Sequence, residues 1–471
     1  SVDMDLKKKL GRIFSLLLSG CLLAALVSCG GGNESSSQPG ESGSSSGGVS
    51  GEEHLGLYLE DGKMKYDGKE FYGLGVNYYS LFNYTFSHQW DTTVPCKALE
   101  TLASYGVKAI RFSCEPPGTL GAAKWDWYYQ RPERYYATLD TLVEKAEEVG
   151  IGLIVEFFGD LYSISDYYDE PLASAVLDEN SKSSQFRRDY VREVVTRYKE
   201  SPAIYGWEFG NELAWNTLRP SGYVPVPALP ANSKRPSRTE EDILGLKEIN
   251  LLYSRFAKAV KECDPYNRIV GNGDQSLQTS AYNASYNDTF ATDTLAEHRE
   301  ILAKINPEGM DAVCMHRYAD GVNLPQAPDK LDLMPSSKPV ELLGEDGKPF
   351  VLYDTWKDYL QYMLDESARL GKTCYVGEAG WSYQDAKEKQ TYESALTVVE
   401  TIAKAALETE YPLILFWNYD PLSMPNEKDY VDKGSGIEYS WNENWDKGKA
   451  YLETIKKYNA KFDQLIAAGK G

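Results

Sequence analysis

The chain has 471 residues, 25% of them charged, and a formal net charge of −21 at pH 7. A negative charge of this size repels nucleic acids and anionic lipid headgroups, so neither is expected as a partner. The sequence also contains 35 Tyr and 10 Trp, more aromatic side chains than we expect a core alone to need.

The first 28 residues predict a bacterial lipoprotein signal peptide. Basic residues at 7–9 and 12 precede an apolar stretch at 13–27, which is shorter than the roughly 20 residues of a membrane span. The sequence Leu-Val-Ser-Cys at 26–29 resembles a lipobox, in which cleavage before Cys29 leaves a lipidated N-terminus. An ordinary secretory signal is the alternative. We therefore expect a protein of the bacterial cell envelope, lipid-anchored or secreted, that meets the membrane through its N-terminal lipid only.

Residues 29–53 consist of little besides Gly, Ser and Glu, a composition that cannot bury a core. A flexible coil of this length spans on the order of 27 Å, enough to act as a tether. Residues 54–471 show no second linker and no internal repeat, so they predict one domain and a monomer. The domain is longer than a bare (β/α)₈ barrel of about 250 residues, which long loops would explain.

The domain opens with a predicted β-hairpin at 57–66, with Asp-Gly turn pairs at 61–62 and 67–68. We expect this hairpin to close the bottom of a barrel. Eight apolar, strand-like runs follow, at 71–79, 107–113, 152–158, 203–211, 268–273, 312–318, 373–378 and 412–418.

Amphipathic segments separate these runs and predict helices, among them 138–149, 185–199, 242–263, 356–370 and 392–407. Alternation of strands and helices predicts the α/β class, and eight units predict a closed (β/α)₈ barrel. An open, doubly wound sheet is the alternative, but no Gly-rich phosphate fingerprint follows any strand. Long irregular segments at 213–239 and 319–353 follow the fourth and sixth strands, where a cleft would lie.

Two of the strands end in a glutamate. The fourth ends in Asn211-Glu212 and the seventh ends in Glu378. The C-terminal ends of barrel strands meet at one mouth, so two carboxylates would face each other there, as glycoside hydrolysis requires. A single glutamate at a strand end is more often a surface ion-pair partner; the pair, with Asn211 adjacent, favours catalysis.

Five motifs in this order resemble glycoside hydrolase family 5, the family of cellulases and mannanases. The resemblance covers residues 71 to about 418. It rests on Val107–Arg111, Gly210-Asn211-Glu212, His316-Arg317-Tyr318, Glu378 within Val-Gly-Glu-Ala-Gly, and Trp417.

The resemblance implies a role for each residue. Glu378 would be the nucleophile, kept ionised by Arg111 and the Tyr318 hydroxyl. Glu212 would be the acid and then the base, and Asn211 would hydrogen-bond the sugar 2-hydroxyl. For retention of configuration, the two carboxyl groups should lie about 5–5.5 Å apart.

Further residues would complete the site. His316 would orient Glu212 or touch the substrate, Trp417 would form an apolar floor, and Trp381 is a further substrate-stacking candidate. We also expect the charge of Glu378 to raise the pKa of Glu212.

One position departs from the family pattern. Phe158 ends the third strand where many members carry His, which leaves the substrate site short of a polar contact that Asp160 would supply. Glu208, two residues before Gly210, is expected to form a structural ion pair with Arg111.

These observations predict a retaining β-glycoside hydrolase, of the endo-β-1,4-mannanase or endo-β-1,4-glucanase type, acting on a plant-type polysaccharide without cofactor or metal. A catalytically inactive, carbohydrate-binding lipoprotein is the alternative, although a binding protein has no need of both glutamates. A metal-dependent hydrolase is disfavoured because the four His lack paired ligand spacing. The cysteines of the domain allow a disulfide without identifying its partners.

Overall fold

The computed structural model describes residues 53–118, 123–224, 229, 235–319, 339–381, 392–422 and 440–469, with the account of 319, 381 and 392–395 limited to the backbone. The chain divides into two units, Ser1–Gly51 and Glu52–Gly471, and every element below belongs to the second. The predicted signal peptide, most of the tether and Cys29 lie outside the described residues.

Eight parallel strands form one sheet in the order β8-β7-β6-β5-β4-β13-β12-β9. Their bounds are β4 Gly73–Asn77, β5 Ala109–Ser113, β6 Gly152–Phe158, β7 Ile204–Gly210, β8 Ile269–Gly271, β9 Ala312–Ala319, β12 Thr373–Trp381 and β13 Leu413–Phe416. The predicted (β/α)₈ barrel is confirmed, and the predicted strands differ from these only by a few residues at their ends.

The two ends of this sheet order, β8 and β9, meet and close the barrel. The amide of Asp311 donates to the Val270 carbonyl at 3.0 Å, and the amide of His316 donates to the Asp274 carbonyl at 2.8 Å. Gln275 and His316 form an isolated parallel bridge. Closure places the tips of all eight strands around one mouth.

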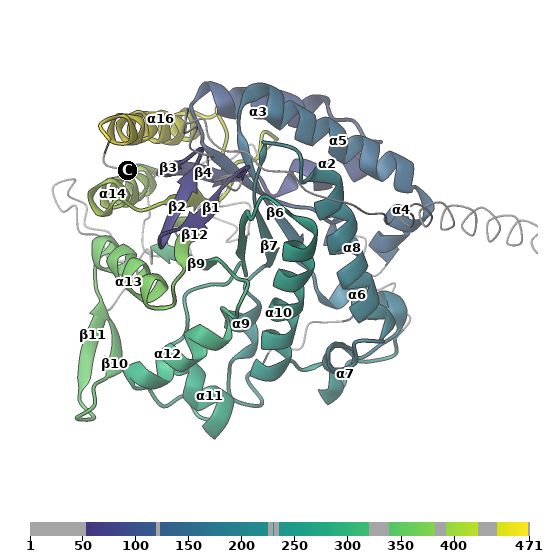
Figure 1. Cartoon of the computed structure of the whole chain (residues 1–471), viewed down its shortest axis with the longest axis vertical. Coiled ribbons are helices and arrows are strands. Elements are labelled where there is room, and N and C mark those ends of the chain that lie inside the picture. Colours follow the sequence, from purple (N-terminus) through teal and green to yellow (C-terminus); the bar gives the residue numbers. More distant parts are fainter. Residues whose placement is uncertain are drawn as a thin grey trace, which may run out of the picture. The chain divides into compact units, whose positions relative to one another are not determined.

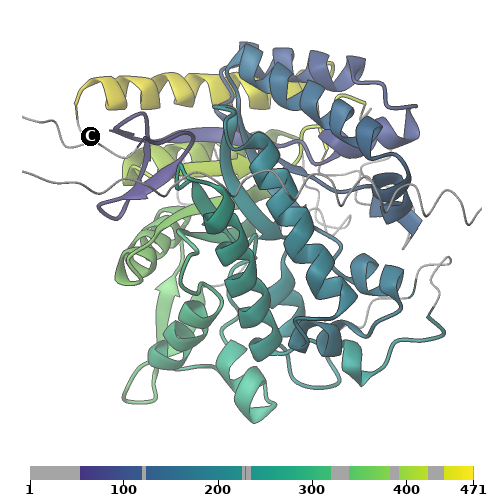
Figure 2. The ribbon, with the colours of Figure 1, turned by 45° about the vertical axis from the view of Figure 1, so that its right-hand side comes forward.

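Helices surround the strands in both views (Figures 1 and 2). The longer ones are α3 Thr93–Ser104, α5 Pro132–Val149, α8 Lys182–Tyr198, α10 Leu246–Cys263, α12 Leu295–Lys304, α13 Trp356–Arg369, α14 Tyr392–Thr409 and α16 Asp446–Ala467. Because the strands are covered on both faces, β4 to β7 are buried along their whole length.

The barrel interior has an apolar lower layer and a charged upper layer. Alternation along β5 directs Ala109 and Arg111 inward, and along β6 it directs Ile154 and Glu156 inward. Ala109 and Ile154 pack in a separate apolar cluster at the N-terminal end, whereas Arg111 and Glu156 form an ion pair nearer the C-terminal end. The interior polarity therefore changes toward the mouth where the site lies.

The N-terminal segment forms a three-stranded antiparallel sheet, one strand more than the predicted hairpin. Its strands are β1 Tyr58–Glu60, β2 Lys63–Tyr66 and β3 Lys69–Glu70. Both Asp-Gly pairs have positive φ at both residues, as the sequence led us to expect for tight turns, and the second turn adds β3. The Leu57 amide donates to the Tyr205 carbonyl at 2.9 Å, so this sheet does lie against the N-terminal end of the barrel.

The two segments expected to be irregular contain short elements. Helix α9 (Leu213–Thr217) follows β7 directly, and the hairpin β10 (Val340–Leu343) and β11 (Pro349–Tyr353) lies between β9 and α13. All five cysteines of the described part are free, so the disulfide that the sequence left open is not formed there. Within the same part, none of the helices has the length and apolar character that a membrane crossing requires.

Candidate active site

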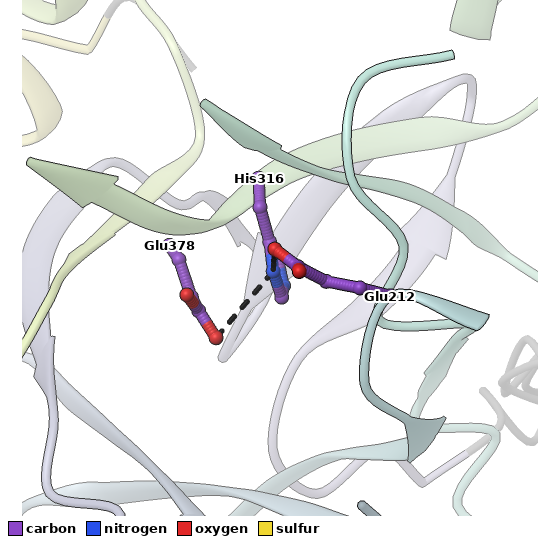
Figure 3. A group of neighbouring side chains, drawn as sticks. All are labelled: Glu212, His316 and Glu378. Atoms are coloured by element: carbon purple, nitrogen blue, oxygen red, sulfur yellow. Dashed lines mark hydrogen bonds and ion pairs between the residues drawn. The ribbon is translucent and has the colours of Figure 1, made fainter. Parts of the chain in front are cut away.

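Glu212 and Glu378 come together at the C-terminal mouth of the barrel. Glu212 lies two residues beyond the end of β7, in the left-handed conformation with φ of 52°, and Glu378 lies within β12. One carboxylate oxygen of each, with a ring nitrogen of His316, lies within 4.8 Å of the others (Figure 3). This spacing is close to the 5–5.5 Å of retaining glycosidases and below the roughly 6.5–9.5 Å of inverting ones.

Glu378 is held by two donors from other strands. Arg111 Nη1 of β5 donates to Glu378 Oε1 at 2.8 Å, and the Tyr318 hydroxyl of β9 donates to Oε2. The side chain of Glu378 is only 6% exposed. A donor on each of its two oxygens fixes the position of this carboxylate, as a nucleophile needs.

Glu212 shares one neighbour with Glu378, since His316 Nδ1 also lies 3.4 Å from Glu378 Oε1. His316 Nδ1 lies 3.1 Å from Glu212 Oε1, and Gln275 Nε2 donates to the same oxygen at 3.3 Å. The main-chain amide of Glu212 donates to the Gly273 carbonyl at 2.8 Å, which fixes the backbone just beyond the strand tip. The side chain is 20% exposed, more than that of Glu378, so it faces the open side of the mouth.

The expected rise in the pKa of Glu212 is wrong for the free protein. Burial raises the pKa of this carboxyl, but the hydrogen bond and charge of His316, with the charge of Arg111, outweigh burial and hold the pKa below its ordinary value. For His316, burial lowers the pKa, but the charges of Glu378 and Glu212 outweigh it and the net direction is upward. The proton shared by this pair is therefore held mainly on the imidazole.

Arg111 is fully buried and contacts three carboxylates. Besides Glu378, its Nε lies 2.5 Å from Glu208 Oε1 and its Nη2 lies 2.6 Å from Glu156 Oε2. The predicted ion pair with Glu208 is confirmed. Burial raises the pKa of Glu156 to about 8, against the opposing charge of Arg111, so Glu156 is mostly protonated at neutral pH. One guanidinium then faces two charged carboxylates, Glu208 and Glu378, and neutralises half of their charge.

The other predicted substrate contacts surround this centre. Asn211 Oδ1 accepts from Arg111 Nη2 at 3.1 Å, which leaves the amide NH₂ to face a ligand. Trp417 is half-buried after β13, and its ring centroid lies 5.6 Å from that of Tyr79. The side chain of Trp381 lies outside the described residues.

Phe158 does not reach this centre. Its ring packs against Phe209 with centroids 5.5 Å apart, in the outer aromatic layer. Asp160, the expected substitute, has Oδ2 at 3.5 Å from Lys124 Nζ, and its amide donates to Glu115 Oε1 at 2.8 Å. Lys124 and Glu115 are themselves buried, so Asp160 is joined to a separate ion pair at the rim.

Sequence reasoning missed four residues of the site. Asn77 and Glu156 contact Arg111. Tyr79 contacts Trp417, and Gln275 contacts Glu212. Glu156 stands in a wholly apolar strand, the same pattern that identified Arg111, so the sequence did contain a sign of it. The other three are ordinary polar residues at strand ends and carried no such sign.

The Glu212–His316–Glu378 group could in principle hold a metal ion, since it offers three donor atoms. Two of the three are already engaged with each other, because His316 Nδ1 faces Glu212. The third belongs to a carboxylate that Arg111 contacts at 2.8 Å, so a cation there would lie beside a guanidinium. This arrangement suits proton transfer and nucleophilic attack better than metal coordination.

Residues 66–421 match the family profile described as cellulase, glycosyl hydrolase family 5. The chain belongs to this family. All the residues that form the site lie inside the matched range.

Several relatives of this family-5 chain are fungal. It is 25% identical over 265 residues to a probable mannan endo-1,4-beta-mannosidase C from Aspergillus terreus, covering 51% of this chain and 61% of the relative. It is 30% identical over 162 residues to mannan endo-1,4-beta-mannosidase A from Podospora anserina, covering 31% of this chain and 42% of the relative. The chain thus spans less than two thirds of the length of these relatives.

Solved structures share the fold. A glycoside hydrolase family 5 mannosidase from Rhizomucor miehei superposes with a TM-score of 0.54 at 15% identity, covering 89% of this chain and 100% of that one. An exo-beta-1,4-mannosidase from Opitutaceae bacterium strain TAV5 superposes with a TM-score of 0.51 at 14% identity, covering 86% and 63%. At these identities the likeness concerns the barrel alone.

The contact between Tyr318 and Glu378 gives a testable expectation for this family-5 site. Tyr318→Phe removes one of two donors to a buried carboxylate, so kcat/KM should fall about 10- to 150-fold, since a hydrogen bond to a charged group contributes about 1.5–3 kcal/mol. Steady-state kinetics measures this. Tyr458→Phe changes a buried tyrosine of the outer helix α16 and should leave kcat/KM unchanged. Equal activity of the two variants would show that the Tyr318 hydroxyl does not support Glu378.

Proposed function

We propose that this protein is a retaining β-glycoside hydrolase that cleaves β-1,4-mannan. The observation that supports it most is the approach of the Glu212 and Glu378 carboxylates to within 4.8 Å at a barrel mouth. Glu378 has the environment of a nucleophile and Glu212 that of a proton-transfer group.

In the first step, a Glu378 oxygen attacks the anomeric carbon while the bond from that carbon to the glycosidic oxygen breaks. Glu212 donates a proton to the departing oxygen, so the leaving sugar is released as a neutral alcohol. The product on the enzyme is a glycosyl ester of Glu378. Asn211 donates from its amide to the 2-hydroxyl, a contact that strengthens as the oxocarbenium-like transition state forms.

In the second step, Glu212 acts as a base. It takes a proton from water as the water oxygen attacks the anomeric carbon, and the ester bond to Glu378 breaks. The sugar leaves with its original configuration. Glu212 then passes the proton taken from water back to His316 Nδ1, 3.1 Å away, and Glu378 is again a free carboxylate.

His316 supplies the proton that Glu212 lacks in the free protein. Its Nδ1 lies 3.1 Å from Glu212 Oε1, so a proton can pass from the imidazole to the carboxylate as the glycosidic oxygen takes one from Glu212. The imidazole is fully buried, which protects this proton from exchange with bulk water. His316 is therefore a positioning and proton-holding residue, and its partner Glu212 is the group that touches substrate.

The choice of mannan rests on the relatives, many of which are named mannan endo-1,4-beta-mannosidases. β-1,4-Glucan, the other substrate that the sequence indicated, differs in the orientation of the 2-hydroxyl. A site that hydrogen-bonds this hydroxyl discriminates strongly between the two, because a misplaced hydroxyl leaves buried polar groups unpaired.

Product profiling on mannan, cellulose, xyloglucan and laminarin tests the proposal. We expect mannan to be cleaved with a kcat/KM at least about tenfold above that of any glucan, a difference of about 1.4 kcal/mol in transition-state stabilisation. Faster cleavage of a glucan than of mannan would show that the substrate is the glucan. Binding without cleavage of all four would favour the inactive, carbohydrate-binding alternative.

The two glutamates should respond differently to truncation. Glu378→Ala should abolish turnover on every substrate. Glu212→Ala should lower mannan hydrolysis by about 10²- to 10⁴-fold, the usual contribution of a general acid, yet spare aryl glycosides with good leaving groups. Added azide should restore part of the Glu212→Ala activity by replacing the water nucleophile. Glu408→Ala, at an exposed position of α14, is the control and should keep full activity. If Glu212→Ala loses equal activity on substrates with good and with poor leaving groups, Glu212 is not the acid.

We further propose that the catalytic domain, residues 54–471, is held at the cell envelope by a lipid on Cys29 through the tether at 29–53. The composition of the tether and the lipobox-like sequence support this. Labelled palmitate supplied during bacterial growth should enter the wild-type protein, and Cys29→Ser should be unlabelled and released. An unlabelled wild-type protein would contradict the anchor.

A further inference from the structure

A second cavity lies in the helical layer, apart from the two glutamates. It has a volume of about 320 Å³ and is bounded by α8 and α10, which run side by side in Figures 1 and 2. Its apolar wall consists of Phe158 and Phe209, at the ends of β6 and β7, and Phe256 of α10. The volume is at the lower end of small-molecule sites, and an aromatic wall with a few polar groups is typical of them.

A buried guanidinium lines this cavity. Arg187 of α8 is only 6% exposed, and its Nη2 donates to Ser184 Oγ at 3.1 Å. Its Nη1 is buried and has no hydrogen-bond partner among the residues that the structure describes. A buried guanidinium that has no ion pair and only part of its hydrogen bonds within the described ranges is unfavourable, so this position is suited to an anion.

A second guanidinium lines the same cavity. Arg255 of α10 also has a buried Nε without a partner within the described ranges. Burial, together with the charge of Arg255, lowers the pKa of Arg187 to about 10, so Arg187 remains a cation at neutral pH. Two like charges facing one cavity repel each other, and an anion between them would remove that repulsion.

The acidic residues that line the cavity, Glu179 and Glu262, pair with cations other than Arg187. Glu179 lies 3.1 Å from Arg255 Nη2, and Glu262 pairs with Arg192 and, at 4.0 Å, with Lys258. No ion pair of the described residues reaches Arg187. The cavity therefore keeps an excess of positive charge at its buried end.

We propose that this cavity binds a small carboxylate that carries a ring with an apolar face. The carboxylate would pair with the guanidinium groups of Arg187 and Arg255, and the ring would pack against Phe158, Phe209 and Phe256. A guanidinium matches the geometry of a carboxylate, and aromatic walls accept either an aromatic ring or the apolar face of a sugar. Sugar acids and aromatic acids share this chemistry.

Isothermal titration calorimetry on the full chain in mild detergent tests the site. D-glucuronate and benzoate are the two probes, and glucose and benzyl alcohol are their uncharged matches. We expect at least one acid to bind and neither uncharged match to do so, because only the acids supply an anion for Arg187. Binding of D-glucuronate would identify the ligand class as sugar acids, and binding of benzoate would identify it as aromatic acids.

Variants locate the binding. Arg187→Met keeps the length and apolar stem of the side chain but removes the charge, and should weaken binding of the acid at least about tenfold, since truncating one partner of a buried charged contact is costly. Arg188→Gln is the matched control: Arg188 lines the same cavity but is more exposed and pairs with Asp189, so affinity should stay the same. Where Arg187→Met fails to fold, Arg255→Gln gives the same comparison and should also weaken binding.

Three results would overturn the proposal. The first is the absence of heat with both acids at tens of millimolar. The second is unchanged affinity in the Arg187→Met variant, or in Arg255→Gln if that is the variant that folds. The third is binding of inorganic phosphate as tightly as either acid, which would show that the aromatic wall contributes nothing.

Discussion

The Arg111 guanidinium is the interaction on which the site depends. It is fully buried at the level where the barrel interior changes from apolar to charged, and it contacts Glu378, Glu208 and Glu156 from three other strands. The charged carboxylates of Glu378 and Glu208 need a cation to be buried there, and the guanidinium needs anions to be buried beside them. Because Arg111 also donates to Asn211, one side chain sets the position of the proposed nucleophile and of the proposed 2-hydroxyl donor.

The two carboxylates proposed for catalysis differ in their neighbours. Glu378 contacts a permanent cation and a hydroxyl and lies 3.4 Å from His316 Nδ1, whereas Glu212 lies closer to that imidazole, at 3.1 Å, and forms no ion pair with Arg111 in the part of the chain that the structure describes. This asymmetry separates the tasks that retention requires, since one carboxylate must stay charged and the other must cycle through its protonated form. In the proposed mechanism His316 holds the proton in the free protein, so the pair rather than Glu212 alone acts as the acid.

The eight strands and the glutamates at their tips could be predicted because buried parallel strands leave continuous apolar runs that end abruptly in polar residues. The ion pair of Glu208 with Arg111 could also be predicted, because alternate side chains of β7 point into the barrel. The pKa of Glu212 could not be predicted, because it depends on the position of the His316 ring, which sequence order does not specify. Glu156 was overlooked although a carboxylate in an apolar strand needs a partner as much as Arg111 does, and β3 was missed because it is only two residues long.

Carboxylates whose nearest oxygens lie within 4.8 Å of each other leave room for attack by Glu378 itself and none for a water between the sugar and the carboxylate, so the proposed reaction retains configuration. Proton NMR of the products formed in the first minutes of β-mannan hydrolysis measures this directly, before the reducing ends mutarotate. The account predicts that the β-anomer appears first and the α-anomer accumulates only later. Appearance of the α-anomer first would mean inversion by an activated water, and would contradict the account.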